Sequence, residues 1–181
     1  GEYIGVLTVR EPNNKHYVYS NYGWDDDEID QFEMSPDSGY VQKCGTPDAF
    51  LHLVDDLSPN AADANTYAEI QELLDIDEYV NYMAIEFFLG STDWPRNNVK
   101  GFRHRNGGKF RLVLYDLDGA FETSDPFRSF FDKEWWEFDQ LYPTSLGRIY
   151  DQIRLVTLFK NLLANDTFRK KFIDAYCIVL G

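Results

Sequence analysis

Hydrophobic and polar positions change their period along the chain, from short strand-like runs near its start to helical stripes later on. Residues 3–10 are rich in β-branched and apolar side chains and predict a strand, which Pro12 ends because proline cannot donate to a β-ladder. Asn13 and Asn14 are suited to cap a short helix that runs to about residue 23, and residues 29–34 predict a second strand. The chain therefore opens with a small β portion.

The signals become helical from residue 46 onward. Thr46 before Pro47 is typical of a helix start, and Thr66 and Asp75 each precede a glutamate by three residues, which is the spacing of a capping box. Residues 78–89 form the best-specified helix, because their apolar side chains recur on one face. The members of this stripe, which we expect in the core, are Val80, Met83, Ala84, Phe87 and Phe88.

A hairpin and two further helices complete the predicted elements. Residues 99–103 and 109–115 flank Asn106-Gly107-Gly108, a turn sequence typical of β-hairpins, and the second strand ends in an apolar run that we expect to be covered on both faces. Residues 122–146 predict a long aromatic-rich loop, and residues 148–164 and 167–180 predict helices. The pattern indicates a single α+β domain over residues 1–181 with a mainly helical body.

Composition narrows the function classes. The chain has 181 residues, of which 44% are hydrophobic, and this is enough for one packed domain. Its 31 acidic and 17 basic side chains give a net charge of −14, which argues against a nucleic-acid partner. No apolar stretch has the length of a membrane span, and the first residues lack the charged and apolar regions of a signal peptide.

Candidate chemistry is concentrated in two loops. The first follows the best-specified helix and holds Asp93 and Asn98, and the second follows the hairpin and holds Asp116 and Asp118. Only the hairpin separates the two loops, so we expect them to emerge at the same edge and to lie close together. Their carboxylate and amide oxygens are hard ligands of the kind that Mg²⁺ prefers, with positions left for phosphate oxygens.

The spacing within these loops points to phosphoryl transfer. Asp93 and Asn98 stand five residues apart, as do the Asp and Asn of a protein-kinase catalytic loop, in which the Asp accepts the substrate proton and the Asn holds a metal. Asp116 follows the hairpin, where a kinase places the Asp that binds the metal ions on the phosphates. Taken alone, each carboxylate is equally compatible with capping a local turn. The ordered set favours the metal and phosphate interpretation.

Several motifs resemble those of one known family. The central ones are Asp93-Trp94-Pro95-x-Asn97-Asn98-x-Lys100, the strand Lys109-Phe110-Arg111, and Tyr115-Asp116-x-Asp118. The opening Gly1-Glu2-Tyr3-x-Gly5 with Arg10-Glu11 and the late segment from Thr167 to Phe172 are individually weaker. Together these motifs resemble the spore coat protein H (CotH) kinase family, at both ends and in the middle of the chain.

The resemblance implies an atypical protein-kinase-like fold that uses ATP with Mg²⁺ or Mn²⁺ to phosphorylate Ser or Thr on secreted, coat or surface proteins. It therefore implies a protein substrate as partner and an extracellular or cell-surface location. It also implies roles for six residues: Asp93 as the catalytic base, Asp116 as the principal metal ligand, Asn98 and Asp118 as further metal ligands, Glu11 near the adenine, and Lys100 near the phosphates.

The chain departs from the kinase pattern in its first part. No His-Arg pair precedes Asp93, which follows Ser91-Thr92 instead, and neither a Gly-rich phosphate loop nor a strand lysine paired with a helix glutamate is found. We therefore expect mainly the helical large lobe with short β-hairpins, the N-terminal small lobe being largely missing, and weak ATP binding by this chain alone.

Two other functions stay open at this point. A catalytically silent surface or coat binding module of the same fold would use the acids only to hold a structural cation, and exposed tryptophans would then serve as a sugar-stacking surface. A haloacid-dehalogenase-type phosphatase would use Asp116 as its nucleophile, because an apolar strand precedes Asp116-x-Asp118-Gly119. Against the phosphatase, Ala120 stands where a threonine is expected, and no βαβ alternation is present.

Overall fold

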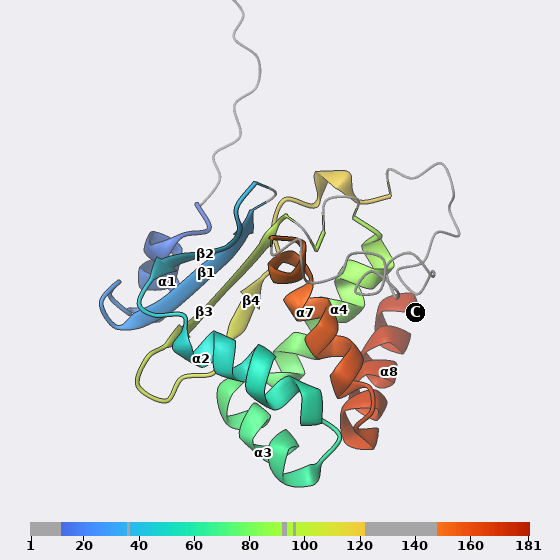
Figure 1. The fold of residues 1–181 in the computed structure, drawn as a ribbon. Helices are drawn as coiled ribbons and strands as arrows, with labels where there is room; N and C mark the ends of the chain where they lie inside the picture. Colours follow the sequence, from blue (N-terminus) through green and yellow to red (C-terminus); the bar gives the residue numbers. More distant parts are fainter. Residues whose placement is uncertain (1–11, 36, 92–93, 96, 122–147) are drawn as a thin grey trace, which may run out of the picture.

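The computed structural model describes residues 12–35, 37–91, 94–95, 97–121 and 148–181, with side chains from residue 154 onward in the last range (Figure 1). The strand predicted over residues 3–10 and the loop predicted over residues 122–146 lie outside the described residues. The described part combines a small antiparallel sheet with a larger set of helices, which confirms the α+β class. In Figure 1 the sheet lies to one side of α4, α7 and α8.

The sheet has four antiparallel strands in the order β2-β1-β3-β4. Their bounds are β1 (Ile29–Ser35), β2 (Gly39–Cys44), β3 (Val99–His104) and β4 (Arg111–Val113). The central strand β1 pairs with β2 as a hairpin and with β3, which comes much later in the sequence. The predicted hairpin of β3 and β4 is confirmed, although β4 is shorter than expected. Leu114 is exposed, so the expectation that its apolar run is covered on both faces is wrong there.

The other regular elements of the described chain are helices. Their bounds are α1 (Lys15–Tyr22), α2 (Asp48–Leu51), η1 (His52–Leu57, a π-helical turn), η2 (Ser58–Asn60, a 3₁₀ turn), α3 (Ala64–Leu73), α4 (Ile76–Leu89), η3 (Leu117–Gly119, a 3₁₀ turn), α7 (Arg148–Leu162) and α8 (Asp166–Leu180). The two helices predicted after residue 147 are confirmed as α7 and α8. None of the helices in the described ranges has the length and apolar character needed to cross a bilayer.

Three of the predicted helix ends are confirmed. The Asn14 side chain accepts a hydrogen bond from the His16 N–H and begins α1. Asp75 accepts from the Glu78 N–H and begins α4, and Gly90 ends that helix in a left-handed conformation at φ 59°. The capping box at Asp75 is only half formed, because the Asp75 N–H donates to the Phe110 carbonyl instead of to the Glu78 side chain.

Two predicted helix starts are wrong. Thr46 does not cap α2, since its N–H donates to the Asp30 carboxylate and Pro47 stands at the cap position without a side-chain hydrogen bond. Thr66 lies inside α3, where Asp63 caps the helix by accepting from the N–H groups two and three residues further on. At α3 Asp63 thus takes the capping role predicted for Thr66, whereas α2 begins without a side-chain cap.

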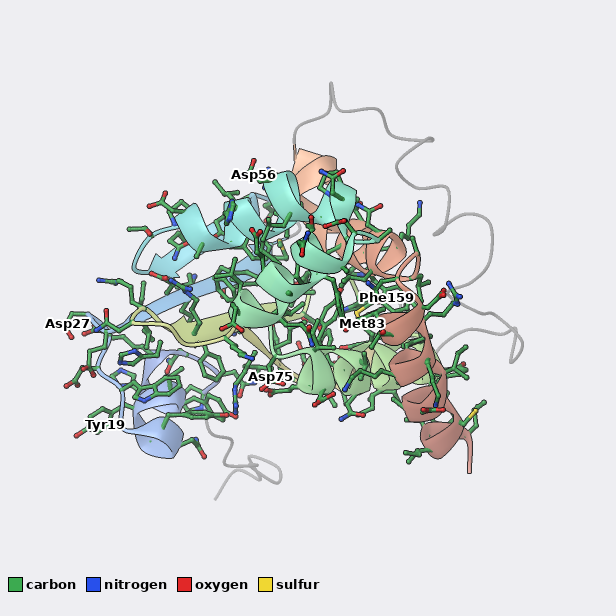
Figure 2. All side chains as sticks on the ribbon, turned by 90° about the horizontal axis from the view of Figure 1, so that it is seen from below. Tyr19, Asp27, Asp56, Asp75, Met83 and Phe159 are labelled. Carbon is green, nitrogen blue, oxygen red and sulfur yellow. The ribbon has the colours of Figure 1, made fainter. Side chains whose placement is uncertain are left out.

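The two faces of the sheet belong to two separate hydrophobic cores. Helix α1 covers one face through a small cluster built on Val18, Ile29, Phe102 and Val113. The other face packs Phe32, Met34 and Leu112 into the main core, which extends through α4, α7 and α8. Figure 2 shows Met83 and Phe159 in the interior of this main core, with Tyr19 and Asp27 near the α1 end of the molecule.

The apolar stripe of α4 lies in the main core, as predicted, with one exception. Val80, Met83, Ala84 and Phe87 are buried, whereas Phe88 is 41% exposed. Phe88 instead forms an edge-to-face contact with the exposed Phe121, their ring centroids 5.7 Å apart. The prediction that Phe88 belongs to the core is therefore wrong, because no element among the described residues covers that side of the last helical turn.

Candidate functional site

A hydrogen bond joins the two loops that carry the candidate chemistry. The Asn98 side chain is 4% exposed, and its Nδ2 donates to the backbone carbonyl oxygen of Asp116 at 3.1 Å. Asn98 directly precedes β3, and Asp116 follows the end of β4 by three residues. Because β3 and β4 form one antiparallel hairpin, the start of the first strand and the end of the second lie at the same edge of the sheet. The predicted proximity of the two loops is confirmed.

Backbone conformation shapes both ends of this link. Asn98 and Asp116 adopt positive φ angles of 58° and 55°, in the left-handed region that asparagine and aspartate tolerate better than most residues. Asp116 serves as the N-terminal flank of η3, and the carboxylates of Asp116 and Asp118 are both exposed. The edge therefore presents two acidic side chains to solvent beside a buried amide.

A charged group lies next to this edge, on the α1 face of the sheet. Glu33 and Lys100 are register partners in β1 and β3, and the Lys100 Nζ lies 3.9 Å from a Glu33 carboxylate oxygen. Lys43 of β2 pairs with the same carboxylate at 2.5 Å. The Lys100 ammonium also lies 4.5 Å from the centroid of the Tyr115 ring, and Tyr115 directly precedes Asp116. Two lysines share one carboxylate, so this group carries a net positive charge.

These side chains line a cavity of about 240 Å³ between the sheet and the first turn of α1. Lys15, Lys43 and Lys100 contribute to its wall together with Glu33. Lys15 also pairs with the exposed Asp26 at 2.5 Å. Lys100 belongs both to the cavity wall and to the contact with Tyr115, so the cavity adjoins the edge that holds Asn98 and Asp116. In a protein of net charge −14, this is a local concentration of basic side chains.

A chain of hydrogen bonds connects Trp94, in the first loop, to two side chains of α4. The Trp94 indole Nε1 donates to the Tyr82 hydroxyl at 2.9 Å, and that hydroxyl is in turn hydrogen-bonded to the Glu86 carboxyl. Trp94 and Glu86 are each 1% exposed. Burial raises the pKa of Glu86 to about 7, although the hydrogen bond from Tyr82 opposes this shift. Burial likewise raises the pKa of the Tyr115 hydroxyl, and the carboxylates of Glu33, Asp116 and Glu86 add to that rise.

The structure thus brings together four of the six predicted site residues. Asn98 and Asp116 are in contact, Asp118 follows within the same turn, and Lys100 reaches Tyr115 from the neighbouring strand. The remaining two, Asp93 and Glu11, lie outside the described residues, so their predicted roles stay predictions.

Sequence reasoning missed Glu86 and Tyr82. The two residues stand four apart on α4, which places them on one side of the helix, but Glu86 falls within an otherwise apolar segment. The sequence held one signal of its burial: Glu86 stands between Ile85 and Phe87 in a helix predicted to be buried.

The donor set at the edge suits a hard divalent cation. Mg²⁺ is commonly bound through one or two carboxylates together with phosphate oxygens, and Asp116 and Asp118 supply two exposed carboxylates. The hydrogen bond to Asp116 uses the amide nitrogen of Asn98, so its amide oxygen is the atom that would bind a cation. Among the described residues no group of three or more His, Cys, Asp or Glu side chains is arranged to hold a metal ion by itself. Two carboxylates and one amide oxygen would leave further coordination positions of such a cation for water or phosphate oxygens.

Comparison with known proteins gives one match. A family model described as CotH kinase protein matches residues 1–180, nearly the whole chain. No curated protein and no solved structure gives a significant match. The family motifs around Asn98 and Asp116 are the ones that the structure brings into contact. The chain belongs to the CotH kinase family.

Proposed function

We propose that this protein is an atypical protein kinase with a kinase-like fold, which transfers the γ-phosphoryl group of ATP to Ser or Thr side chains of secreted, coat or surface proteins. The hydrogen bond between Asn98 and Asp116 carries the proposal, because a kinase needs the two corresponding motifs at one place. Membership of the CotH kinase family and the α+β architecture support it.

In the proposed reaction, Asp93 accepts the proton of the substrate hydroxyl while the hydroxyl oxygen bonds to the γ-phosphorus. The bond from that phosphorus to the β,γ-bridging oxygen breaks, and ADP leaves with its electron pair. The role of Asp93 rests on its place directly before Trp94 in the family motif. When bound, Mg²⁺ or Mn²⁺ neutralises the charge on the phosphate oxygens.

Asp116 is the proposed principal metal ligand, with Asp118 and the Asn98 amide oxygen as further ligands. All three lie in the two loops that meet at the edge of the hairpin. A metal held by these carboxylates would also bind phosphate oxygens of the nucleotide, since Mg²⁺ is usually shared between protein carboxylates and phosphates.

Lys100 is the proposed contact to the nucleotide phosphates, and the cavity beside it is the proposed place for the rest of the nucleotide. The group formed by Lys43, Lys100 and Glu33 has an excess positive charge, which favours an anionic ligand. Glu11 is proposed to lie near the adenine on the basis of the family motif.

The experiment that tests the proposal is thermal unfolding with and without millimolar ATP and Mg²⁺ or Mn²⁺. A ligand at about 100 times its Kd stabilises a protein by roughly 2.7 kcal/mol. For a chain of this size that raises the Tm by about 5–10 °C. Because this chain alone is expected to bind ATP weakly, we expect a small metal-dependent rise in it, a larger one in an N-terminally extended chain, and none in Asp116→Asn.

Asp27→Asn is the matched control, because Asp27 is an exposed aspartate in the turn before β1. It is expected to shift as the wild type does. The proposal fails if ATP with metal raises the Tm of neither this chain nor an N-terminally extended one, or if Asp116→Asn responds equally.

The two alternatives predict different results. A silent binding module would tolerate Asp93→Asn without loss of any function, and a phosphatase would form a trappable phosphoaspartate on Asp116. Trp94 is buried and unsuited to stack on a sugar, whereas Trp135 and Trp136, the other tryptophans of the first alternative, lie outside the described residues. The antiparallel pairing of all the described strands differs from the parallel sheet that βαβ units build, which weakens the second.

A further inference from the structure

Glu86 is an acidic side chain in an unusual position. It lies in the last turn of α4, directly before the core residue Phe87, and is 1% exposed. One carboxylate oxygen, Oε2, has no hydrogen-bond partner among the described residues. Burial of a carboxyl group is unfavourable unless hydrogen bonds compensate for the lost water. A leucine would fill such a site without this penalty, so packing alone does not account for a glutamate here.

The hydrogen bonds around Tyr82 have a fixed direction. The Tyr82 hydroxyl accepts from the Trp94 indole, which can only donate. The single hydroxyl proton is therefore available for the Glu86 carboxylate, and this bond favours the ionised form of Glu86. The direction runs from the Trp94 N–H through the Tyr82 O–H to Glu86. Hydrogen bonds to a carboxylate are shorter and stronger than those between neutral groups, so the acceptor at the end of this chain fixes the hydroxyl firmly.

Tyr79, on the same helix, provides an internal comparison. It is also buried, and its hydroxyl donates to the Leu155 backbone carbonyl at 2.8 Å. A main-chain carbonyl therefore satisfies one buried tyrosine of α4, whereas Tyr82 is held by a carboxylate and receives the indole as well. The additional contact connects Tyr82 to the loop after α4.

We propose that Glu86 is a positioning residue, whose buried carboxylate orients the Tyr82 hydroxyl and thereby fixes the indole of Trp94, the residue that directly follows Asp93 in the sequence. The inference rests on the proposed kinase function, because it assigns Asp93, the residue before Trp94, as the base. Trp94 is enclosed by edge-to-face contacts with Tyr82 and Phe87. These contacts all come from α4, and the Tyr82 hydroxyl connects Glu86 to Trp94.

The test has one readout that does not depend on activity. The indole N–H groups of the tryptophans give separate resonances in a ¹⁵N-labelled sample, and Trp94→Phe identifies the one from Trp94. We expect Glu86→Leu and Tyr82→Phe to move this resonance in the same direction. Glu86→Gln, whose amide oxygen can still accept from Tyr82, is expected to leave it near its original position. Tyr79→Phe is the matched control and should not move it.

The second readout is phosphoryl transfer. We expect Glu86→Leu to lower kcat by about 10- to 100-fold, in the range that misplacement of a reacting group causes. The KM for ATP should stay near its wild-type value, because the cavity-wall residues Lys15, Lys43 and Lys100 take no part in this chain of hydrogen bonds. Glu86→Gln should recover most of kcat, and Tyr79→Phe should keep it, although it loses a buried hydrogen bond of similar kind.

The outcomes separate this inference from the proposed function. A Trp94 resonance that is unmoved in both Glu86→Leu and Tyr82→Phe would overturn the hydrogen-bonded chain, whatever the activity. A moved resonance with unchanged kcat would show that Glu86 is only structural and would overturn its positioning role. If the wild type transfers no phosphate although Asp116 binds metal and ATP, the proposed function fails, and the resonance still decides whether Glu86 holds Trp94.

Discussion

The side chain of Asn98 reaches the main chain of Asp116 across the hairpin, with Nδ2 lying 3.1 Å from the carbonyl oxygen. Both residues have left-handed backbone conformations, at φ 58° and 55°. One hydrogen bond thus joins two backbone positions that are each less favourable than extended or helical ones. It holds the two candidate loops in register without using the carboxylate of Asp116, which leaves that carboxylate available for a ligand.

We predict that Asn98→Gly lowers the free energy of unfolding by about 1–2 kcal/mol, because it removes a buried hydrogen bond but keeps the positive φ. Asn98→Ala is expected to cost about 1 kcal/mol more, since alanine is strained in the left-handed region. Urea unfolding at constant pH measures both. Equal stabilities for the two variants would contradict the role given to the backbone conformation.

Gly101 of β3 tests how tightly the sheet packs on the main core. A Cβ atom at this position would lie 2.5 and 2.6 Å from two ring carbons of Phe32. Phe32 is buried against Tyr40 and Phe50 and has little room to move. We therefore expect Gly101→Ala to lower the free energy of unfolding by about 1–3 kcal/mol.

The matched test is a double-mutant cycle with Phe32→Leu. The smaller side chain makes room for the new methyl group, so the double variant should be more stable than the sum of the two single changes predicts. Strict additivity in thermal or urea unfolding would show that Phe32 is not the group that excludes a side chain at position 101.

Asp30 of β1 carries a buried ion-pair group. Its carboxylate accepts from the Arg103 Nε at 2.9 Å, from the Arg105 Nε at 3.2 Å and from the Thr46 N–H at 3.0 Å. Burial raises the pKa of Asp30, but these three interactions lower it by more, so the net pKa lies below its ordinary value of 3.8. Asp30→Asn should cost about 3 kcal/mol near neutral pH, because it leaves a largely buried arginine without its partner.

The sign of the pH dependence follows from the lowered pKa. The stabilisation by Asp30 is present above about pH 4 and is lost as the pH falls through the lowered native value, so the gap between wild type and Asp30→Asn should narrow in acid. Asp26→Asn is the control: its pair with Lys15 is exposed, and its effect should stay near zero. A gap that widens below pH 4 would contradict the assignment.

Glu86 should show the opposite dependence. Burial raises its pKa from 4.5 to about 7, so its effect on folding is most favourable below pH 4.5 and is lost as the pH rises to about 7. We predict that the free energy of unfolding of Glu86→Gln, measured relative to wild type, increases by about 1–3 kcal/mol as the pH rises from 5 to 8. Thermal unfolding across this range measures the difference. A constant difference would mean that the native carboxyl titrates near its ordinary pKa.

Sequence patterns predict the elements whose structure is determined by residues close together in the chain. Helix α4 was predicted well, because its aspartate cap, its apolar stripe and its terminal glycine agree with one another. Strand β2 was missed, since its side chains are mostly half-buried and polar, and its place is decided by pairing with β1. Thr46 misled for a similar reason: its N–H is bound by Asp30, sixteen residues earlier in the chain.

The candidate site divides in the same way. The nearness of Asn98 and Asp116 was predictable, because a short hairpin leaves little freedom to the two loops it separates. The buried contact between Tyr82 and Glu86 was not predictable, since a tyrosine and a glutamate four residues apart occur equally well on an exposed helix face. Only the packing of Trp94 against α4 makes their burial apparent.

The order of the strands has a consequence for synthesis on the ribosome. The partners Asp30 and Arg103 are 73 residues apart in the chain, so β1 and β2 are synthesised roughly 4–15 s before β3 exists. During this interval the inner edge of β1 is an open strand edge, which is a site for pairing with another chain. Before β3 is made, Asp30 and Glu33 of β1 lack their register partners in that strand, and charged side chains on an open strand discourage aggregation. The carboxylate that later binds two arginines thus also protects the nascent hairpin.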